Sequence, residues 1–133
     1  MGRHVTSAET VFKALANENR LRIVNLFRST GRPLCVCELV DSLGMPEYQV
    51  SRHLATLKQA GLVGAQKHGT WAYHSLSDDP ALSSLWTLVD ELLTGEPYET
   101  DVTLLKRRLE MRAGNHCVVG VVDRDKLLQG LQK

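Results

Sequence analysis

The sequence predicts a mainly α-helical fold with one small β-hairpin, and two neighbouring patterns lead to this prediction. A short apolar helical pattern at 37–43 is followed by Gly44 and by a longer helical pattern that begins at Pro46. Two helices joined by a glycine turn are typical of a helix-turn-helix. Directly after them, strand-like segments at 62–67 and 70–76 flank a His-Gly pair, which favours a hairpin turn. Since a hairpin in this position forms a wing, the expected architecture is a winged helix-turn-helix.

The helices around this unit are indicated by apolar spacing and by capping residues. Apolar residues recur at i, i+3, i+4 and i+7 between Ala8 and Leu15, as on one face of a helix. Asn17 is a suitable N-cap for a second helix, and Gly31 is a suitable end for it. A fifth helix is expected after Asp79, and its apolar stripe is wide enough to pack against a second subunit.

The last part of the chain carries weaker signals. A sixth helix is expected at about 101–112. Further on, residues 118–122 could form an edge strand, and residues 123–132 could form one or two helical turns.

Composition places the chain among globular proteins. It has 133 residues, of which 43% are hydrophobic, enough for one domain with a core and terminal arms. We expect a winged helix-turn-helix domain for DNA binding and dimerisation at 6–95, and a C-terminal helix and tail carrying Cys117 at 96–133. No apolar run approaches the roughly 20 residues that span a bilayer, and the N-terminus lacks the apolar core of a signal peptide. A cytoplasmic location without a membrane partner is therefore expected, with the three cysteines as thiols rather than disulfides.

Charge is distributed unevenly along the chain, although the net charge is only +1. Residues 3–32 contain six Lys or Arg against two Glu, whereas residues 78–101 contain seven carboxylates and no Lys or Arg. Such a division predicts one surface that meets an anion and another that faces away from it.

The second helix of the helix-turn-helix is the expected DNA-reading element. Its N-terminal residues should lie in the major groove, where Arg52 suits guanine and Gln49 suits adenine. Ser51 and His53 are expected to contact phosphate or to hold the helix in place, and the wing tip is expected to contact the DNA backbone. The complete set of expected DNA-binding residues is Tyr48, Gln49, Ser51, Arg52, His53, Lys67 and His68.

Two cysteines, Cys35 and Cys37, stand one residue apart at the expected start of the third helix. Thiolates bind soft ions, and a helix N-terminus lowers the pKa of a thiol and so favours the thiolate. Because successive side chains turn by about 100° around a helix, thiols two positions apart point in nearly opposite directions. They can share one ion only if the first turn is extended or unwound. The alternative is that both are small residues of the core.

These patterns resemble the ArsR/SmtB family of winged-helix metal-sensing repressors over about residues 8–93. The resemblance rests, in chain order, on Leu15-Ala16-Asn17-Glu18-Asn19-Arg20-Leu21-Arg22-Ile23, Cys35-Val36-Cys37-Glu38-Leu39, Ser51-Arg52-His53-Leu54, Ala60-Gly61-Leu62-Val63 and Gly69-Thr70-Trp71-Ala72-Tyr73-His74-Ser75-Leu76. It implies a homodimeric repressor that leaves its double-stranded operator DNA when arsenite or antimonite binds Cys35 and Cys37. Trivalent arsenic generally binds three thiolates, which makes Cys117 the candidate third ligand. The chain departs from the family pattern at Val40, where arsenite sensors of this type place a further cysteine.

Other functions are expected to be distinguishable from this one. A related branch of the family uses a similar Cys-x-Cys element, so Cd(II) and Pb(II) are alternative inducers. A thiol redox sensor, in which Cys35 or Cys37 pairs with Cys117 on oxidation, is a second alternative. An enzyme is not expected, because no nucleophile stands beside an activating base and no glycine loop cradles phosphate. No organic cofactor is expected.

Overall fold

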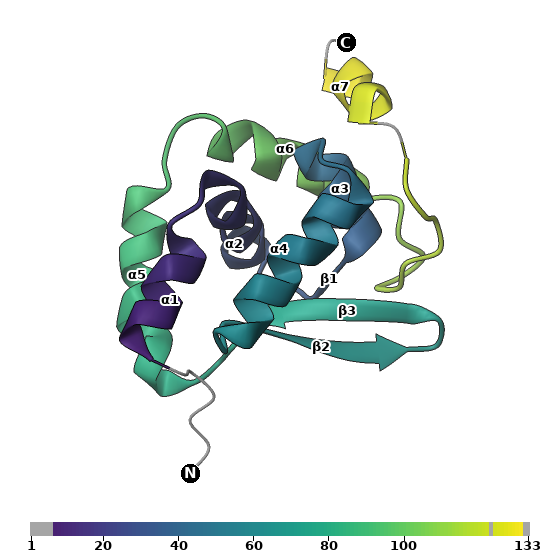
Figure 1. Ribbon diagram of the computed structural model, residues 1–133. Helices are drawn as coiled ribbons and strands as arrows, with labels where there is room; N and C mark the ends of the chain where they lie inside the picture. Colours follow the sequence, from purple (N-terminus) through teal and green to yellow (C-terminus); the bar gives the residue numbers. More distant parts are fainter. Residues whose placement is uncertain (1–6, 123, 132–133) are drawn as a thin grey trace.

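The computed structural model describes residues 7–122 and 124–131 as a mainly helical protein with a small antiparallel sheet (Figure 1). In chain order the elements are α1 (Ala8–Leu15), α2 (Glu18–Thr30), β1 (Leu34–Cys35), α3 (Val36–Leu43), α4 (Glu47–Gln59), β2 (Val63–His68), β3 (Trp71–Leu76), the 3-10 turn η1 (Pro80–Leu82), α5 (Ser83–Leu92), α6 (Tyr98–Leu109) and α7 (Arg124–Leu131). The winged helix-turn-helix expected from the sequence is confirmed.

Local capping explains where the first helices begin and end. The Asn17 side chain accepts a hydrogen bond from the Arg20 amide, as an N-cap should, and Gly31 ends α2 with a φ of 64°. In the helix-turn-helix, Gly44 ends α3 with a φ of 69°, a conformation that glycine adopts without strain. Pro46 is the N-cap of α4 rather than its first residue. The two helices are thus joined by a short turn, so a movement of α3 is passed directly to α4.

The sheet contains one strand more than the expected hairpin. Strands β2 and β3 pair antiparallel, and β1 pairs with the other edge of β3 to give the order β1-β3-β2. In this register Cys35 lies opposite Tyr73. The wing is therefore attached to the segment that leads into α3, and its buried face lies beside a cysteine.

One hydrophobic core joins the helices. Its members include Ile23, Leu39 and Leu54 from the first four helices, Trp86 from α5 and Leu105 from α6. Helix α6 packs against both α2 and α3, and α7 contacts α3 and α6. The part of the chain after residue 95 therefore contributes to the same core as the helix-turn-helix. No helix among the described residues is long and apolar enough to cross a membrane.

Residues 118–122 do not form the edge strand that the sequence suggested. Their polar backbone groups bond instead to buried charged side chains: Arg108 donates to the carbonyl oxygens of Val119 and Gly120, and the Val122 amide donates to Asp41. Because these partners are side chains, the segment needs no neighbouring strand. The expected C-terminal helical turns are present as α7, while residues 123 and 132 lie outside the described part of the chain.

Part of the uneven charge distribution is used for pairing between the basic and the acidic segments, and the division into two oppositely charged surfaces stays a prediction. The basic and acidic segments pair with each other. Arg22 donates to both oxygens of the buried Asp101 at 2.8 Å, and Arg28 donates to Asp90 at 2.9 and 2.7 Å. These bonds fasten α2 to α6 and α5, which explains why charges separated in the sequence are neutralised in the fold.

Candidate thiol site and nucleic-acid interface

The first thiol lies at the junction between β1 and α3. Cys35 is the N-cap of α3, with an extended backbone at φ −85° and ψ 157°, and the helix begins at Val36. The pairing of β1 with β3 holds Cys35 in this conformation. The start of the Cys-x-Cys element is thus extended, the geometry that sharing one ion requires.

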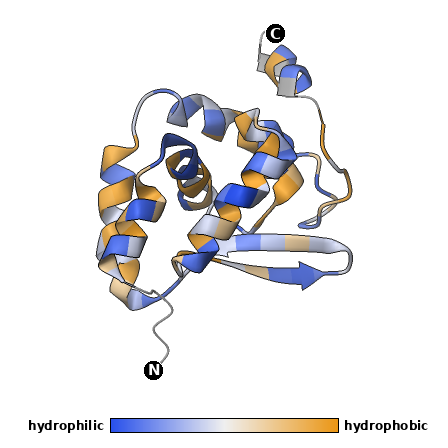
Figure 2. Ribbon diagram, in the orientation of Figure 1, coloured by the Kyte–Doolittle hydropathy of each residue, from blue (hydrophilic) through white to orange (hydrophobic). Residues whose placement is uncertain are grey.

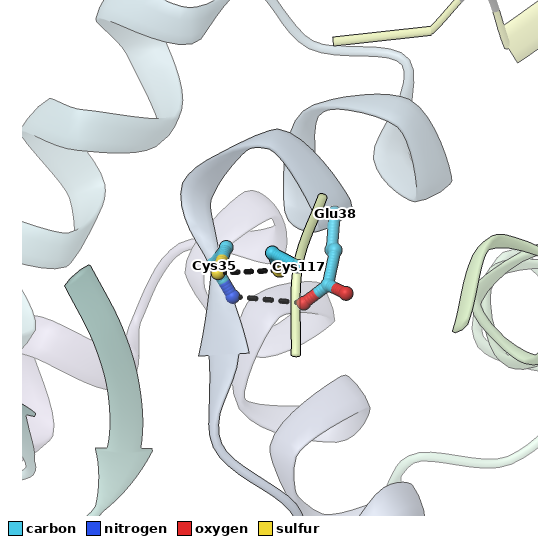
Figure 3. A group of neighbouring side chains, drawn as sticks. All are labelled: Cys35, Glu38 and Cys117. Atoms are coloured by element: carbon cyan, nitrogen blue, oxygen red, sulfur yellow. Dashed lines mark hydrogen bonds between the residues drawn. The ribbon is translucent and has the colours of Figure 1, made fainter. Parts of the chain in front are cut away.

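Cys117 lies beside Cys35, although 82 positions separate them in the sequence (Figure 3). Their Sγ atoms are 2.7 Å apart, and both side chains are buried. The Cys117 amide donates to the Tyr73 hydroxyl at 2.8 Å, which fixes the backbone of Cys117 against the wing. Among the described residues, the ligand atoms of Cys35, Glu38 and Cys117 form a group in which all lie within 4.8 Å of one another.

Cys37 belongs to the same buried cluster but not to that tight group of ligand atoms. The cluster consists of Cys35, Cys37, Tyr73 and Cys117, with Trp71 packed against it. The Cys37 Sγ faces the carbonyl oxygen of Val119 at 3.6 Å. Its side chain must turn to join the other two thiols on one ion.

Glu38 closes the N-terminus of α3 and is fully engaged there. One carboxylate oxygen accepts the Cys35 amide at 2.9 Å, and Arg112 donates to both oxygens at 2.6 and 2.7 Å. Burial would raise the pKa of Glu38, but the bonds from Arg112 and from the Cys35 amide outweigh it and lower the pKa. Glu38 is therefore an ionised group held by Arg112 and by the start of α3, beside the thiols.

A second buried pair lies on the same face of α3, where Arg108 donates through Nε to Asp41 at 2.7 Å. Neither ion pair was predicted from the sequence. Glu38 was expected as part of the Cys-Val-Cys-Glu-Leu motif, and Arg108 and Arg112 had no expected role. One signal could have suggested them. Glu38 and Asp41, three positions apart, share a face of an apolar helix, and so do the basic residues at 108 and 112, four positions apart.

The pKa values of Cys35 and Cys37 are raised rather than lowered, contrary to the effect expected of a helix N-terminus. Burial raises the pKa of Cys35, and the neighbouring Cys117 thiol raises it further. Burial raises the pKa of Cys37 to about 11, even though the charge of Arg108 opposes it. Desolvation outweighs the helix N-terminus because both side chains lie in the protein interior. Ligand capture must therefore remove the protons of these two thiols.

The expected DNA-reading face of α4 is largely accessible. Tyr48, Ser51 and Arg52 are exposed, Gln49 is half-buried, and the Arg52 guanidinium lies over the Tyr48 ring, 5.7 Å from its centroid. In Figure 2 the end of β2 near the wing tip is hydrophilic, and α4 carries hydrophilic residues among apolar ones. On the wing, Lys67 and His68 are exposed at the end of β2.

His53 differs from the other expected DNA-binding residues because it is buried. Its Nδ1 lies 3.3 Å from a guanidinium nitrogen of Arg20, and its Nε2 has no hydrogen-bond partner among the described residues. Burial and the nearby charges of Arg20 and Arg52 lower its pKa, so the ring is neutral at pH 7. The contact with Arg20 links α4 to α2, which fits the second role expected for His53, that of holding the helix in place.

Helices α1 and α5, which lie on the opposite side of the molecule from the wing tip in Figure 1, carry exposed apolar side chains. Phe12 of α1 is 62% exposed, and Leu88 and Leu92 of α5 are 50% and 66% exposed. The wide apolar stripe expected on the fifth helix is thus only partly covered within one chain.

Comparisons with known proteins agree with this architecture. Residues 17–64 match the family described as "Bacterial regulatory protein, arsR family". An uncharacterised HTH-type transcriptional regulator of Methanocaldococcus jannaschii is 40% identical over 92 residues, which are 69% of this chain and all of that protein. The arsenical resistance operon repressor of Escherichia coli is 45% identical over 67 residues, 50% of this chain and 56% of that protein. The chain thus spans little more than half the length of this arsenic-related relative.

Solved structures give the same result. Reduced HlyU from Vibrio cholerae superimposes with a TM-score of 0.58 at 31% identity, covering 66% of this chain and 90% of that chain. A homodimeric winged helix-turn-helix DNA-binding domain from Mycobacterium bovis, described as a possible ArsR-family regulator, gives a TM-score of 0.56 at 32% identity. That match covers 63% of this chain and 75% of the other.

Proposed function

Since the chain belongs to the ArsR family of winged helix-turn-helix transcriptional regulators, we propose that it is a homodimeric repressor released from its operator by trivalent arsenic or antimony. The observation that carries the proposal is the buried cluster of Cys35, Cys37 and Cys117 at the start of α3. Buried sulfur donors suit a soft ion, and three cysteines match the three bonds of a trivalent metalloid. The names of the E. coli and Bacillus subtilis relatives, both arsenical resistance operon repressors, support the same ligand class.

The position of the cluster suggests how binding would reach DNA. For all three sulfurs to share one ion, Cys37 must turn away from Val119, and this changes the first turn of α3. Helix α3 leads through the short Gly44 turn into α4, so the change would shift α4 relative to its twin in the dimer. A coupling of about 1–3 kcal/mol, or 5–150-fold in affinity, is typical of such systems.

A dimer is proposed through the apolar surface formed by Phe12, Leu88 and Leu92. Burying these side chains against the same surface of a second copy would remove them from water. Two recognition helices would then reach major grooves about 34–36 Å apart. Arg52 and Gln49 are the proposed base-reading residues, with Lys67 at the wing tip on the DNA backbone.

An anaerobic titration of the reduced protein with arsenite tests the proposal directly. The thiols lost per subunit are counted while absorbance from sulfur–arsenic bonds is followed in the near ultraviolet. Loss of three thiols is expected, and loss of two would remove Cys117 from the site. Failure to bind arsenite tightly would refute the proposed inducer.

Serine variants connect binding to function. Cys35→Ser and Cys37→Ser are expected to bind operator DNA as the wild type does but to remain bound when arsenite is added. Fluorescence anisotropy of labelled operator DNA measures both properties. If either variant still leaves DNA at the wild-type arsenite concentration, that cysteine is not a ligand.

The cadmium or lead alternative differs in its proton balance. Arsenious acid, As(OH)3, condenses with three thiols to release three waters and no net proton, whereas Cd(II) or Pb(II) displaces one proton for every thiol that it binds. Because Cys37 has a pKa of about 11, Cd(II) affinity should rise steeply between pH 6 and 8. Arsenite affinity should change little over the same range. The inducer is the ion that releases the protein from operator DNA, so a release by Cd(II) or Pb(II) and not by arsenite would favour the alternative.

The redox alternative is favoured by the 2.7 Å approach of the Cys35 and Cys117 sulfurs. In that reaction the two thiols give two electrons and two protons to a peroxide, which is reduced, and a disulfide forms. Release of DNA by peroxide without any metalloid, lost in Cys117→Ser, would support a redox sensor. No effect of peroxide on DNA binding would exclude it.

A further inference from the structure

Residues 117–122, named here the C-terminal strap, cross α3 and carry Cys117 at one end. The strap is held by hydrogen bonds rather than by apolar packing. Val118, Val119 and Val121 are 55%, 39% and 55% exposed, so Cys117 is its only fully buried side chain. The force that keeps the strap in place must therefore come largely from its backbone.

The backbone of the strap is bound by one buried ion pair. Arg108 donates to the carbonyl oxygens of Val119 at 2.9 Å and Gly120 at 2.8 Å, and the Val122 amide donates to Asp41 at 2.7 Å. The side chains of Asp41 and Arg108 are 0% and 1% exposed, and 2.7 Å separates their bonded atoms. Buried charges that bond to backbone groups hold those groups in defined positions.

The same strap carbonyl connects this ion pair to the thiols. The Val119 oxygen that accepts from Arg108 also lies 3.6 Å from the Cys37 sulfur. Asp41 stands on α3, which has Cys35 as its N-cap and Cys37 in its first turn, so one element carries two thiols and the anchor for the third. We infer that Asp41 and Arg108 are positioning residues for Cys117, and that they decide whether a soft ion meets three thiols or two.

The inference about ion binding rests on the proposed function, whereas the position of the strap can be tested without any ligand. Val122→Pro removes the Val122 amide that donates to Asp41 and keeps both side chains of the ion pair. Val121→Pro is the matched control, because the Val121 amide donates to no described residue and its side chain is exposed. Specific DNA binding by both variants would show that they fold.

In the ligand-free experiment, the rate at which Cys117 reacts with iodoacetamide is measured by peptide mass spectrometry. Cys117 is 4% exposed, so alkylation requires the strap to open. Loss of a bond to a buried carboxylate is expected to accelerate alkylation about tenfold or more in Val122→Pro, and not in Val121→Pro. Equal rates in the two variants would overturn the inference. If Val122→Pro does not fold, Arg108→Lys provides the test, because it keeps a positive charge beside Asp41 but loses the forked donation to the carbonyl oxygens of Val119 and Gly120.

The arsenite experiment uses a double-mutant cycle. In Val122→Pro, arsenite is expected to bind two thiols, with the affinity that it has for Cys117→Ser. Adding Cys117→Ser to Val122→Pro should weaken arsenite binding no further. The positioning role would be overturned if Val122→Pro bound arsenite through three thiols at wild-type affinity. It would also be overturned if the losses of arsenite affinity added up in the double variant. Should the wild type bind no arsenite, the proposed inducer fails, while the alkylation rates still decide whether Asp41 and Arg108 hold the strap.

Discussion

Replacing Arg112 with methionine should strongly destabilise the protein, because it leaves the carboxylate of Glu38 buried without its counter-charge. The Glu38 side chain is 0% exposed and that of Arg112 is 4% exposed, so water cannot replace the lost partner. In the variant, the Cys35 amide still donates to this carboxylate but brings no positive charge. Methionine keeps much of the volume of the arginine stem, so the effect reports on charge rather than on a cavity.

The size of the effect follows from the burial of this pair. Removing one partner of a buried ion pair costs about 3–5 kcal/mol. For a chain of this length, each 1 kcal/mol lowers Tm by roughly 3–5 °C, which predicts a decrease of roughly 10–20 °C. The double variant Glu38→Gln/Arg112→Met removes both charges, so it should lose only about 1–2 kcal/mol.

Urea unfolding followed by tryptophan fluorescence measures these differences, at equal subunit concentration because a dimer unfolds in a concentration-dependent way. The pH dependence provides a second check. The pKa of Glu38 is lowered in the wild type, so its stabilisation is complete above about pH 4.5 and is lost as the pH falls through the folded value. In Arg112→Met, burial raises the pKa of Glu38, so this carboxylate is protonated at a higher pH than in the wild type. Protonation then removes the uncompensated buried charge from the variant. The difference in unfolding free energy between the wild type and Arg112→Met should therefore shrink as the pH falls from 7 towards 4.

Two results would refute this reasoning. A loss below about 1 kcal/mol for Arg112→Met would mean that Glu38 finds water or another donor, and that the pair is not effectively buried. A stability difference that stays constant between pH 7 and 4 would mean that the loss comes from packing rather than from the charge of Glu38.

Two further predictions concern DNA binding and assembly. Arg52→Ala should reduce the preference for operator over random DNA by about 5–150-fold, whereas Lys67→Ala should weaken binding to both and lower the salt slope by about one. Anisotropy titrations at several salt concentrations separate these effects, and equal losses on both DNAs for Arg52→Ala would exclude base reading. Leu92→Glu should weaken dimerisation about 10–150-fold in sedimentation equilibrium, with Val121→Glu as an equally exposed apolar control. A dimer unchanged by Leu92→Glu would place the interface elsewhere.

The sequence by itself determined the local architecture of this protein. The spacing of apolar residues located α1 to α5, Asn17 and Gly31 located the ends of α2, and Gly44 located the turn of the helix-turn-helix. Such signals are readable because they depend on neighbours within about one helical turn or one hairpin. The pair Cys35 and Cys37 was visible for the same reason.

Only the tertiary structure decided which distant residues meet. It brought Cys117 to Cys35, paired Arg108 and Arg112 with the acids of α3, and buried His53. Charge counts along the chain could not reveal these pairs, because any of several opposite charges could have met before the helices packed. The raised pKa of the thiols likewise depends on burial, which outweighs the helix N-terminus. Burial and long-range pairing are properties of packed elements, and no local pattern in the sequence specifies them.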